Sequence, residues 1–409
     1  MSSSTQIAQA KGFRNAFSLL ESGSSVSVSS YKIHRVLLEN DVDSFQLDSS
    51  SAISQFVQSL QPLQRKNAQL IRNIHTEMGL LQLGNLQMPV TSNETEYANS
   101  YVCSSYNAYI SYAAEELHLI KNHWSQATIR SLLPFMSSLL KWGKINRTLS
   151  INNWLFSTCP FPRIHFAELK AMTERLSLEN PHHSLSIRSL NRYSNAQEMD
   201  NLEKLGWIFL PARQVYLFKQ EANWWKKNNV KNDQRLLRKT ELTLVEPHEH
   251  LESDFAEIER CFNQLYIEKH SQYNPQYSAE YFYGLHQQGT LEFYSYRDSD
   301  NRIVATMALF EQNDVITMPV VGYDTNLPQS MGLYRLTIGL LLKITHQRNK
   351  LLNLSSGAAE FKKNRGGEAE IEYTAYYCKH LPIEQKLLLK SLNTLLNRFA
   401  PSLFAANQI

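Results

Sequence analysis

The sequence predicts an α/β (α+β) protein in which mixed sheets are flanked by helices. Its 409 residues exceed what one hydrophobic core usually supports, so two domains are expected. In the second half, short apolar stretches alternate with stretches whose apolar residues recur at helical spacing. The hydrophobic share of 43% and the charged share of 19% are typical of a globular protein. We expect domains at residues 1–225 and 241–409, joined by a linker helix at residues 226–240.

The first domain is expected to alternate strands with helices around a mixed or parallel sheet. Residues 31–37 alternate apolar and polar side chains, as an edge strand does. The further predicted elements are helices at residues 110–123 and 125–142, a strand at 152–157, a helix at 166–176, a strand at 184–190, a helix at 197–205 and a strand at 206–217. The charged linker is expected to be a solvated helix.

The second domain shows the clearer alternation of predicted strands and helices. Its predicted elements are a strand at 243–245, helices at 251–269 and 279–287, strands at 291–296, 303–310 and 315–321, a helix at 333–346, a strand at 351–354, a short basic helix, a strand at 370–377 and a C-terminal helix opened by Pro382. The crossover helix at 333–346 requires that the strands it joins run parallel. We expect these two strands to splay apart at their ends.

Charge and cysteine usage narrow the class of protein. A net charge of +3 is too small to indicate nucleic acid by itself, so no DNA partner is expected. The four cysteines are scattered without a CxxC pair, which predicts no zinc site and a reducing compartment. No signal peptide is recognisable, and no apolar run reaches the roughly 18 residues that span a bilayer. We therefore expect a cytoplasmic protein with no membrane span and no metal.

Five short motifs stand out in the second half. They are PVVGYD at residues 319–324, GLYR at 332–335, SGA at 356–358, FKKNRGG at 361–367 and KHLP at 379–382. Together with the element order, they resemble the FemAB-like and BioF2-like acyltransferase group, which is built from two Gcn5-related N-acetyltransferase (GNAT) domains. The resemblance covers roughly residues 205–400. It implies two GNAT-like domains, of which the first is degenerate and the second carries the acyltransferase site.

The resemblance also implies a reaction. An acyl group would pass from a thioester donor, acyl-CoA or acyl carrier protein, to an amine acceptor, with no permanently bound cofactor. A FemAB-like transferase that uses aminoacyl-tRNA is one alternative. A non-catalytic GNAT scaffold that binds a carrier protein or a peptide is another. The scarcity of glycines in the loop at residues 322–332 favours the scaffold. The polar pairs Tyr323–Asp324 and Tyr334–Arg335 near that loop favour an enzyme.

The loop at residues 322–332 is the first candidate site. In GNAT proteins the corresponding loop holds the donor's pyrophosphate on a helix N-terminus, where unpaired N–H groups face the phosphate. Here only the two flanking glycines remain, which departs from the R/Q-x-x-G-x-G/A pattern of acetyl-CoA users. Tyr323, Asp324, Tyr334 and Arg335 lie in or next to this loop, with Arg335 expected to bind substrate. A tight loop fixed by Pro328 and Gly332, without a ligand, is the alternative.

The second candidate is the basic segment that follows Ser356. Lys362, Lys363 and Arg365 fall on one helical turn beside flexible glycines, which suits a phosphate, a carboxylate or a carrier protein. Cations near a helix C-terminus are also favoured by the macrodipole without any ligand. We assign Lys363 to the solvated helix end and expect Ser356, Lys362 and Arg365 to bind the donor.

Acid–base chemistry requires a group that accepts the amine proton and one that donates to the leaving group. Glu370 and Glu372 share one face of the last strand, although two glutamates there are more often solvent-facing. Glu372 or Asp324 is the expected base. The acid is expected among Tyr323, Tyr334 and Tyr373.

Acceptor binding is expected just after the long helix of the second domain. Lys269, Tyr273 and Asn274 lie there, where aromatic side chains form an acceptor pocket or simply cover the core. Cys103 lies in a tyrosine-rich patch at residues 97–106, and we interpret it as an inert buried thiol. The neighbouring histidines of the segment PHEH at 247–250 fit a surface turn better than a metal site.

Overall fold

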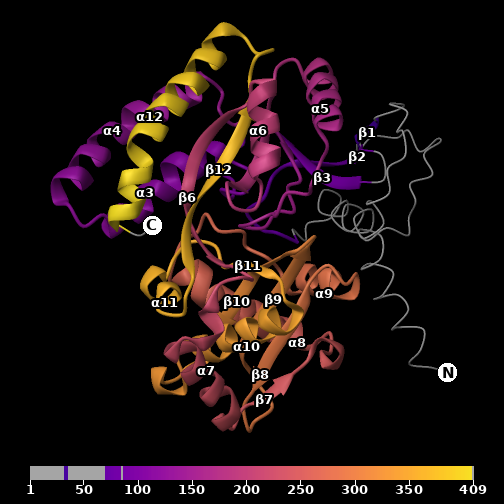
Figure 1. Ribbon diagram of the computed structural model, residues 1–409, viewed down its shortest axis with the longest axis vertical. Helices are drawn as coiled ribbons and strands as arrows, with labels where there is room; N and C mark the ends of the chain where they lie inside the picture. The colour runs from indigo at the N-terminus through magenta and orange to yellow at the C-terminus, as the bar shows by residue number, and fades with distance from the viewer. Residues whose placement is uncertain (1–31, 36–69, 84–85, 408–409) are drawn as a thin grey trace.

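The computed structural model describes residues 32–35, 70–83 and 86–407, and its strands form one continuous mixed sheet flanked by helices (Figure 1). The strands are β1 (Lys32–Arg35), β2 (Glu77–Leu83), β3 (Leu86–Asn93), β4 (Thr148–Ile151), β5 (Ser184–Asn191), β6 (Ile208–Phe218), β7 (Thr243–Val245), β8 (Glu292–Arg297), β9 (Ile303–Gln312), β10 (Val315–Tyr323), β11 (Leu351–Asn353) and β12 (Glu368–Tyr377). Their spatial order is β1-β2-β3-β4-β5-β12-β6-β11-β10-β9-β8-β7.

The two halves of the chain exchange their last strands in the middle of this sheet. β6, which ends the first half, pairs antiparallel with β11 of the second half. β12, which ends the second half, pairs antiparallel with β5 of the first half and with β6. The division of the chain into domains at residues 226–240 stays a prediction, because the sheet and part of the core run through both halves.

Each half contains one parallel strand pair, and both pairs are short. β4 pairs with β5 from Thr148 to Ile151, and β10 pairs with β11 from Val315 to Thr317. Beyond Thr317 a bulge interrupts β10, which then continues without β11 as its partner. The predicted parallel pairing of β10 with β11 is confirmed, and their splaying stays a prediction. The second half follows the predicted order of strands and helices from β7 to β12.

Helices cover the faces of the sheet. They are α3 (Tyr112–Glu116), α4 (His123–Trp142), α5 (Phe166–Glu179), α6 (Ala196–Leu205), α7 (Asn228–Lys239), α8 (Asp254–Phe262), α9 (Ala279–Gln287), α10 (Leu333–Arg348), α11 (Ala359–Lys363) and α12 (Ile383–Asn407). Two π-helical segments, η2 (Asn107–Ser111) and η6 (Asn263–Glu268), adjoin α3 and α8. Short 3-10 turns are η3 (Leu117–Leu119), η4 (Asn223–Lys226), η5 (Pro247–Glu249) and η7 (Gln329–Met331). In the part of the chain just described, no helix is both long and apolar enough to cross a bilayer.

One predicted element of the first half was wrong, and another is shorter than predicted. The strand predicted at residues 152–157 is an irregular segment, because β4 ends at Ile151 and the backbone turns at Asn152 and Leu155, which have φ values of 57° and 62°. Its apolar side chains reflect burial in a loop: Trp154, Leu155 and Phe156 pack with Phe310 and other residues of the second half. The helix predicted at residues 110–123 is present but shorter: η2, α3 and η3 follow one another without a break, and the chain becomes extended at Ile120.

The predicted linker helix is present as α7 and packs along α10. Asp233 of α7 is fully buried, and its Cβ would lie 3.1 Å from a side chain added at Gly339 of α10. Gln234 donates a hydrogen bond to the Gly339 carbonyl oxygen at 2.9 Å. One face of α7 is therefore an integral part of the second half, and the helix is not fully solvated.

Candidate active site

An ion pair joins the two exchanged strands at the centre of the sheet. Arg213 of β6 and Glu372 of β12 are register partners, and Arg213 Nε donates to Glu372 Oε1 at 2.9 Å. Arg213 Nη2 also donates to the Ser157 carbonyl oxygen at 2.7 Å and to Thr158 Oγ1 at 2.9 Å. Burial disfavours the cation, but the charge of Glu372 outweighs this and raises the pKa of Arg213 above its ordinary value. Glu372 is buried rather than solvent-facing, and its Oε2 has no hydrogen-bond partner among the described residues.

The charge of Arg213 acts on three side chains of the first half, namely Tyr101, Tyr112 and Glu116. Tyr101 and Tyr112 lie with their ring centroids 5.0 Å apart, and the Arg188 guanidinium lies 5.9 Å from the Tyr101 ring. Burial raises the pKa of both tyrosines, and the charge of Arg213 opposes the rise in each. Burial also raises the pKa of Glu116, and its hydrogen bond with Tyr112 and the charge of Arg213 oppose this. Glu116 is therefore a half-buried carboxyl group whose pKa lies above its ordinary value.

Two tyrosines of the second half complete the surroundings. Tyr266 belongs to η6, and burial raises its pKa, with Tyr334 and Tyr101 adding to the rise and Arg213 opposing it. Burial raises the pKa of Tyr334 to about 12. The Tyr334 ring lies 6.3 Å from that of Tyr323 and 5.1 Å from that of Phe361. We call Arg213, Glu372, Tyr101, Tyr112, Glu116 and Tyr266 the Arg213 cluster; Tyr334 and Tyr323 extend it into the second half.

Lys362 lies on the second-half side of the cluster. Its Nζ donates to the carbonyl oxygens of Leu354, Ser355 and Ser356 at 2.7, 3.2 and 2.6 Å. Its side chain is buried, and Nζ lies 5.6 Å from the Tyr216 ring centroid. Burial lowers the pKa of Lys362 from 10.5 to about 7, and the charge of Arg213 adds to the decrease. All three ammonium donors are used to fix the loop after β11, and Ser356 takes part through its backbone carbonyl.

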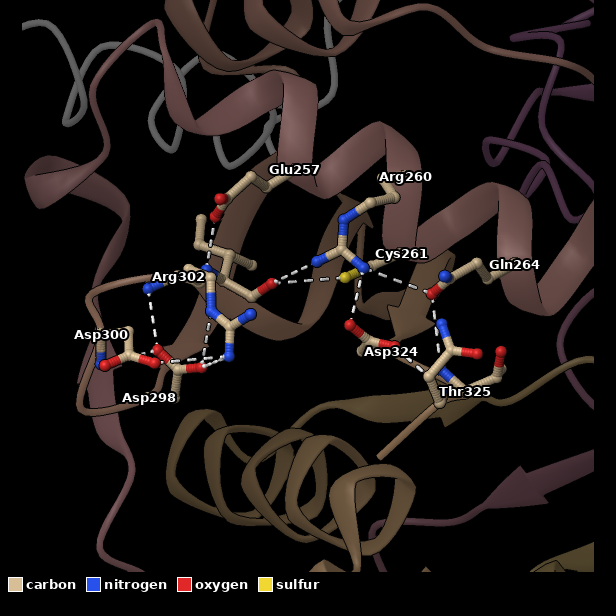
Figure 2. A network of polar contacts seen from close by, with 11 residues as sticks. Glu257, Arg260, Cys261, Gln264, Asp298, Asp300, Arg302, Asp324 and Thr325 are labelled. Atoms are coloured by element: carbon tan, nitrogen blue, oxygen red, sulfur yellow. Dashed lines mark hydrogen bonds and ion pairs between the residues drawn. The ribbon is translucent and has the colours of Figure 1, made fainter. Parts of the chain in front are cut away.

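The Asp324 side chain belongs to a network anchored on α8 and η6 (Figure 2). Arg260 Nη1 donates to Asp324 Oδ2 at 2.8 Å, and the backbone N–H of Asn326 donates to Oδ1 at 3.0 Å. Burial alone would raise the pKa of Asp324, but these hydrogen bonds and the Arg260 charge outweigh it and leave the pKa below its ordinary value. A carboxylate held in this way stabilises the loop after β10 and is poorly suited to accept a proton near neutral pH.

Arg335 and Arg365 both pair with one buried carboxylate. Asp233 of α7 accepts from Arg335 Nε at 2.9 Å and from Arg365 Nε and Nη2 at 2.5 and 3.1 Å. Arg365 is buried and also donates to the Phe361 carbonyl oxygen at 3.0 Å, whereas 43% of the Arg335 side chain is exposed. This triad joins α7, α10 and the turn that follows α11. The predicted substrate-binding roles of Arg335 and Arg365 stay predictions.

The loop predicted to bind an acceptor connects the two halves. The Tyr273 carbonyl oxygen accepts from the Tyr101 N–H at 3.1 Å, and Asn73 Nδ2 donates to the Asn274 carbonyl oxygen at 2.8 Å. Asn274 Nδ2 donates to the Tyr266 carbonyl oxygen at 3.0 Å, so its side chain stabilises the end of η6. Lys269 is exposed just before this loop. The loop thus positions Tyr101 and Tyr266, whereas its contact with an acceptor stays a prediction.

The two glycines that flank the loop at residues 322–332 are required by packing. A Cβ at Gly322 would lie 2.5 Å from the Cys261 carbonyl carbon, because the end of α8 lies directly against β10. Gly332 has a φ of +64°, and a Cβ there would lie 3.0 Å from Leu236 of α7. Packing of the surrounding chain therefore accounts for both glycines, whereas a ligand role of the loop stays a prediction.

A cavity of about 260 Å³ lies at another part of the junction between the halves. None of the predicted site residues lines it. Its lining is rich in amide and hydroxyl side chains and includes Phe161, Ser189, Asn191, Tyr193, Ser194, Asn195, Gln220, Asn313 and Asn353.

The sequence predicted part of the cluster and missed the rest. Glu372, Tyr334, Tyr323 and Lys362 are brought to it or next to it. Arg213, Glu116, Tyr112 and Tyr266 were missed, because their proximity depends on strand exchange and on two π-helical segments. The tyrosine-rich patch at residues 97–106 was the available signal, since it contains Tyr101.

No family model and no curated protein sequence matches this chain. Among solved structures, it resembles FemX, with 9% identity, coverage of 55% of this chain and 80% of that chain, and a TM-score of 0.43. It also resembles L-PGS from Bacillus licheniformis, with 11% identity, coverage of 56% and 77%, and a TM-score of 0.41. A tandem GNAT protein from the clavulanic acid biosynthesis pathway has 9% identity, coverage of 56% and 75%, and a TM-score of 0.33. At these values the likeness carries no argument about activity.

Proposed function

We propose that this chain transfers an acyl group from an activated ester, most simply a thioester of coenzyme A or of an acyl carrier protein, to an amine. The observation that carries the proposal is the position of Arg213. Its charge acts on proton-transfer groups that come from both halves of the chain, namely Glu116 and Tyr112 from one and Tyr266 and Lys362 from the other. Perturbed titratable groups that converge in this way are typical of active sites.

Glu116 is the proposed general base. The amine nitrogen attacks the thioester carbonyl carbon, a C–N bond forms, and the Glu116 carboxylate accepts the proton that the nitrogen loses. Its raised pKa, caused mainly by burial, makes this carboxylate a stronger base than an exposed glutamate. In this proposal Glu116 replaces Asp324 as the base, because Asp324 is already paired with Arg260.

The tyrosines are the proposed hydrogen-bond donors. Burial raises the pKa of Tyr112 and of Tyr334, so both phenols stay protonated at neutral pH. Such a phenol can stabilise the oxyanion as the carbonyl carbon becomes tetrahedral. When the C–S bond breaks, a phenol can also protonate the leaving sulfur. Glu372 holds the Arg213 guanidinium in place, so that its positive charge stays near the developing negative charge.

The experiment measures donor consumption. Wild-type protein is incubated with acetyl-CoA and longer acyl-CoA donors and with primary amines, and free thiol is followed over time. We expect amine-dependent thiol release, together with an amide of the corresponding mass. If no thioester releases thiol but aminoacyl-tRNA donates its aminoacyl group, then aminoacyl-tRNA replaces thioesters as the proposed donor class. Turnover of neither donor class would favour the scaffold alternative and contradict the proposed reaction.

A further inference from the structure

Helix α4 exposes a ridge of large apolar side chains. Trp124, Phe135 and Trp142 have 85%, 66% and 62% of their surface exposed. Their spacings of 11 and 7 residues place all three on one side of an α-helix. The residues between them on the same side are small and uncharged: Thr128, Ser131 and Ser138. This ridge therefore carries no charged side chain along its length.

The charges that flank the ridge are all positive. Across its 20 residues α4 contains Arg130 and Lys141 but no aspartate or glutamate. A helix that meets only water normally covers its outer face with charges of both signs. The composition of α4 instead matches a helix whose apolar side enters a lipid interface while basic side chains reach anionic head groups.

Helix α12 packs against α4 and also exposes large apolar side chains. Leu140 of α4 shares a core cluster with Leu388 and Leu392 of α12, and the Lys121 N–H bonds Asn407 Oδ1 at 2.8 Å, so the helices pack side by side in opposite directions (Figure 1). Ile383, Leu387, Leu395 and Phe399 of α12 are exposed by 64%, 56%, 44% and 57%. Its charged residues are Lys386, Lys390, Arg398 and a single acid, Glu384.

The exposed apolar residues are concentrated on this pair. Twelve large apolar side chains are exposed among the described residues, and eight of them lie on α4 and α12. Scattered exposed apolar residues are ordinary, whereas a gathered patch marks an interaction surface. Tryptophans stand at both ends of α4, about 27 Å apart at 1.5 Å per residue. Indole rings favour the interface between lipid and water, so both ends of a helix lying flat would be anchored.

We propose that the α4–α12 surface docks on an anionic membrane, with α4 lying in the plane of the interface. The excess of cations over acids selects this occupant over a second copy of the chain, since two such faces would repel each other. Docking needs no spanning segment, because only the outer side chains enter the lipid. This proposal is independent of the proposed acyl transfer.

The test uses the whole chain and sedimented vesicles of stated composition. One set contains phosphatidylcholine alone, and the other contains equal parts of phosphatidylcholine and phosphatidylglycerol. We expect binding to the anionic vesicles that weakens as salt rises. The combined change Trp124→Ser, Phe135→Ser and Trp142→Ser should weaken partition roughly tenfold or more. The combined change Arg130→Gln, Lys390→Gln and Arg398→Gln should weaken binding by a similar factor and reduce its salt dependence, with Lys141 and Lys386 remaining.

A matched control carries Leu178→Ser and Leu251→Ser, two apolar residues that are 79% and 64% exposed elsewhere. It should bind vesicles like the wild type. Thermal unfolding of all variants checks that the changes leave the fold intact. The proposal is overturned if the wild type binds neither vesicle, or if the triple serine variant binds as well as the wild type. Sedimentation that shows a wild-type dimer, dissociated by the serine variant and indifferent to vesicles, would also overturn it and identify a protein interface.

Discussion

Arg213 and Glu372 face each other across two neighbouring strands that end opposite halves of the chain, with Nε and Oε1 2.9 Å apart. The pair is almost entirely enclosed: the side chains are 19% and 4% exposed. A buried pair of this kind is costly to break, since the partner left behind is an uncompensated charge. It is also placed where charge can act on groups from both halves. The ion pair is therefore expected to affect both the stability of the fold and the proposed acyl transfer, and mutation can separate the two effects.

The first prediction separates the effect of the Arg213–Glu372 pair on stability from its effect on acyl transfer. Arg213→Met leaves Glu372 buried and unpaired, so we expect the free energy of unfolding to fall by about 3–5 kcal/mol. Adding Glu372→Met removes the orphaned charge, so the double variant should recover most of that loss but no acyl transfer. Chemical denaturation and the thiol-release assay measure the two effects. Activity returning together with stability in the double variant would show that the ion pair serves only the fold.

The second prediction concerns Asp233, whose carboxylate pairs with both Arg335 and Arg365. Asp233→Ala leaves the buried Arg365 and the half-exposed Arg335 without their carboxylate. We expect a loss of about 3–5 kcal/mol in the free energy of unfolding. Arg235→Ala, which removes an exposed side chain of the same helix, is the control and should cost less than about 0.5 kcal/mol. Equal, small losses in both variants would mean that Asp233 does not hold α10 and the turn that follows α11 to α7.

The third prediction follows from Lys362. Because burial lowers its folded-state pKa from 10.5 to about 7, the unfolded chain binds more protons than the folded chain between these values. Stability should therefore rise with pH across this window, by on the order of 1 kcal/mol or more. In Lys362→Met this contribution should be absent. Chemical denaturation at pH 7 and at pH 10 measures the free energy of unfolding of both proteins. If it depends on pH identically in both, the pKa of Lys362 is not lowered by burial.

The fourth prediction tests the role assigned to Asp324. Its folded-state pKa lies below the ordinary value of 3.8, so its contribution to stability is present above that pH and is lost as the pH falls through the folded-state value. Asp324→Asn should cost about 1 kcal/mol near neutral pH, because Arg260 is partly exposed and the pair is screened. The cost should shrink in acid, and turnover should stay within a few-fold of wild type. A loss of turnover of about 10² or more without a stability change would restore Asp324 as the base.

The sequence predicted most elements of the second half because periodicity and turn residues are local signals. Even the parallel alignment of β10 with β11 follows locally, from the length of the crossover through α10. The exchange of β6 and β12 has no local signal, because both strands have the same apolar pattern wherever they pair. The segment around Trp154 was wrongly predicted as a strand for the same reason. A buried loop and a buried strand contain similar apolar side chains, so a short apolar run does not distinguish them.

The site was less predictable than the fold. Lys362 and Arg365 were identified as cations among glycines, but their acceptors, three loop carbonyls and Asp233, lie at positions that charge patterning does not connect. Glu116 was missed because an ordinary amphipathic helix would expose it. Only the irregular path through η2, α3 and η3 brings it towards Arg213. Glu372 was predicted as a site residue, but its partner Arg213 lies 159 positions away in the chain, so no local signal indicated the ion pair.

The most direct test of the proposed site is the pH dependence of acyl transfer in Glu116→Gln. The amide keeps the size of the side chain, so the fold should be retained, while the proton acceptor is lost. We predict that turnover falls by about 10²–10⁴ and that the acidic limb of the wild-type pH–rate profile disappears. Glu115→Gln, the preceding exposed carboxyl group, should behave like the wild type. Turnover in Glu116→Gln within a few-fold of wild type, with the acidic limb unchanged, would contradict the central claim that Glu116 is the base at the Arg213 cluster.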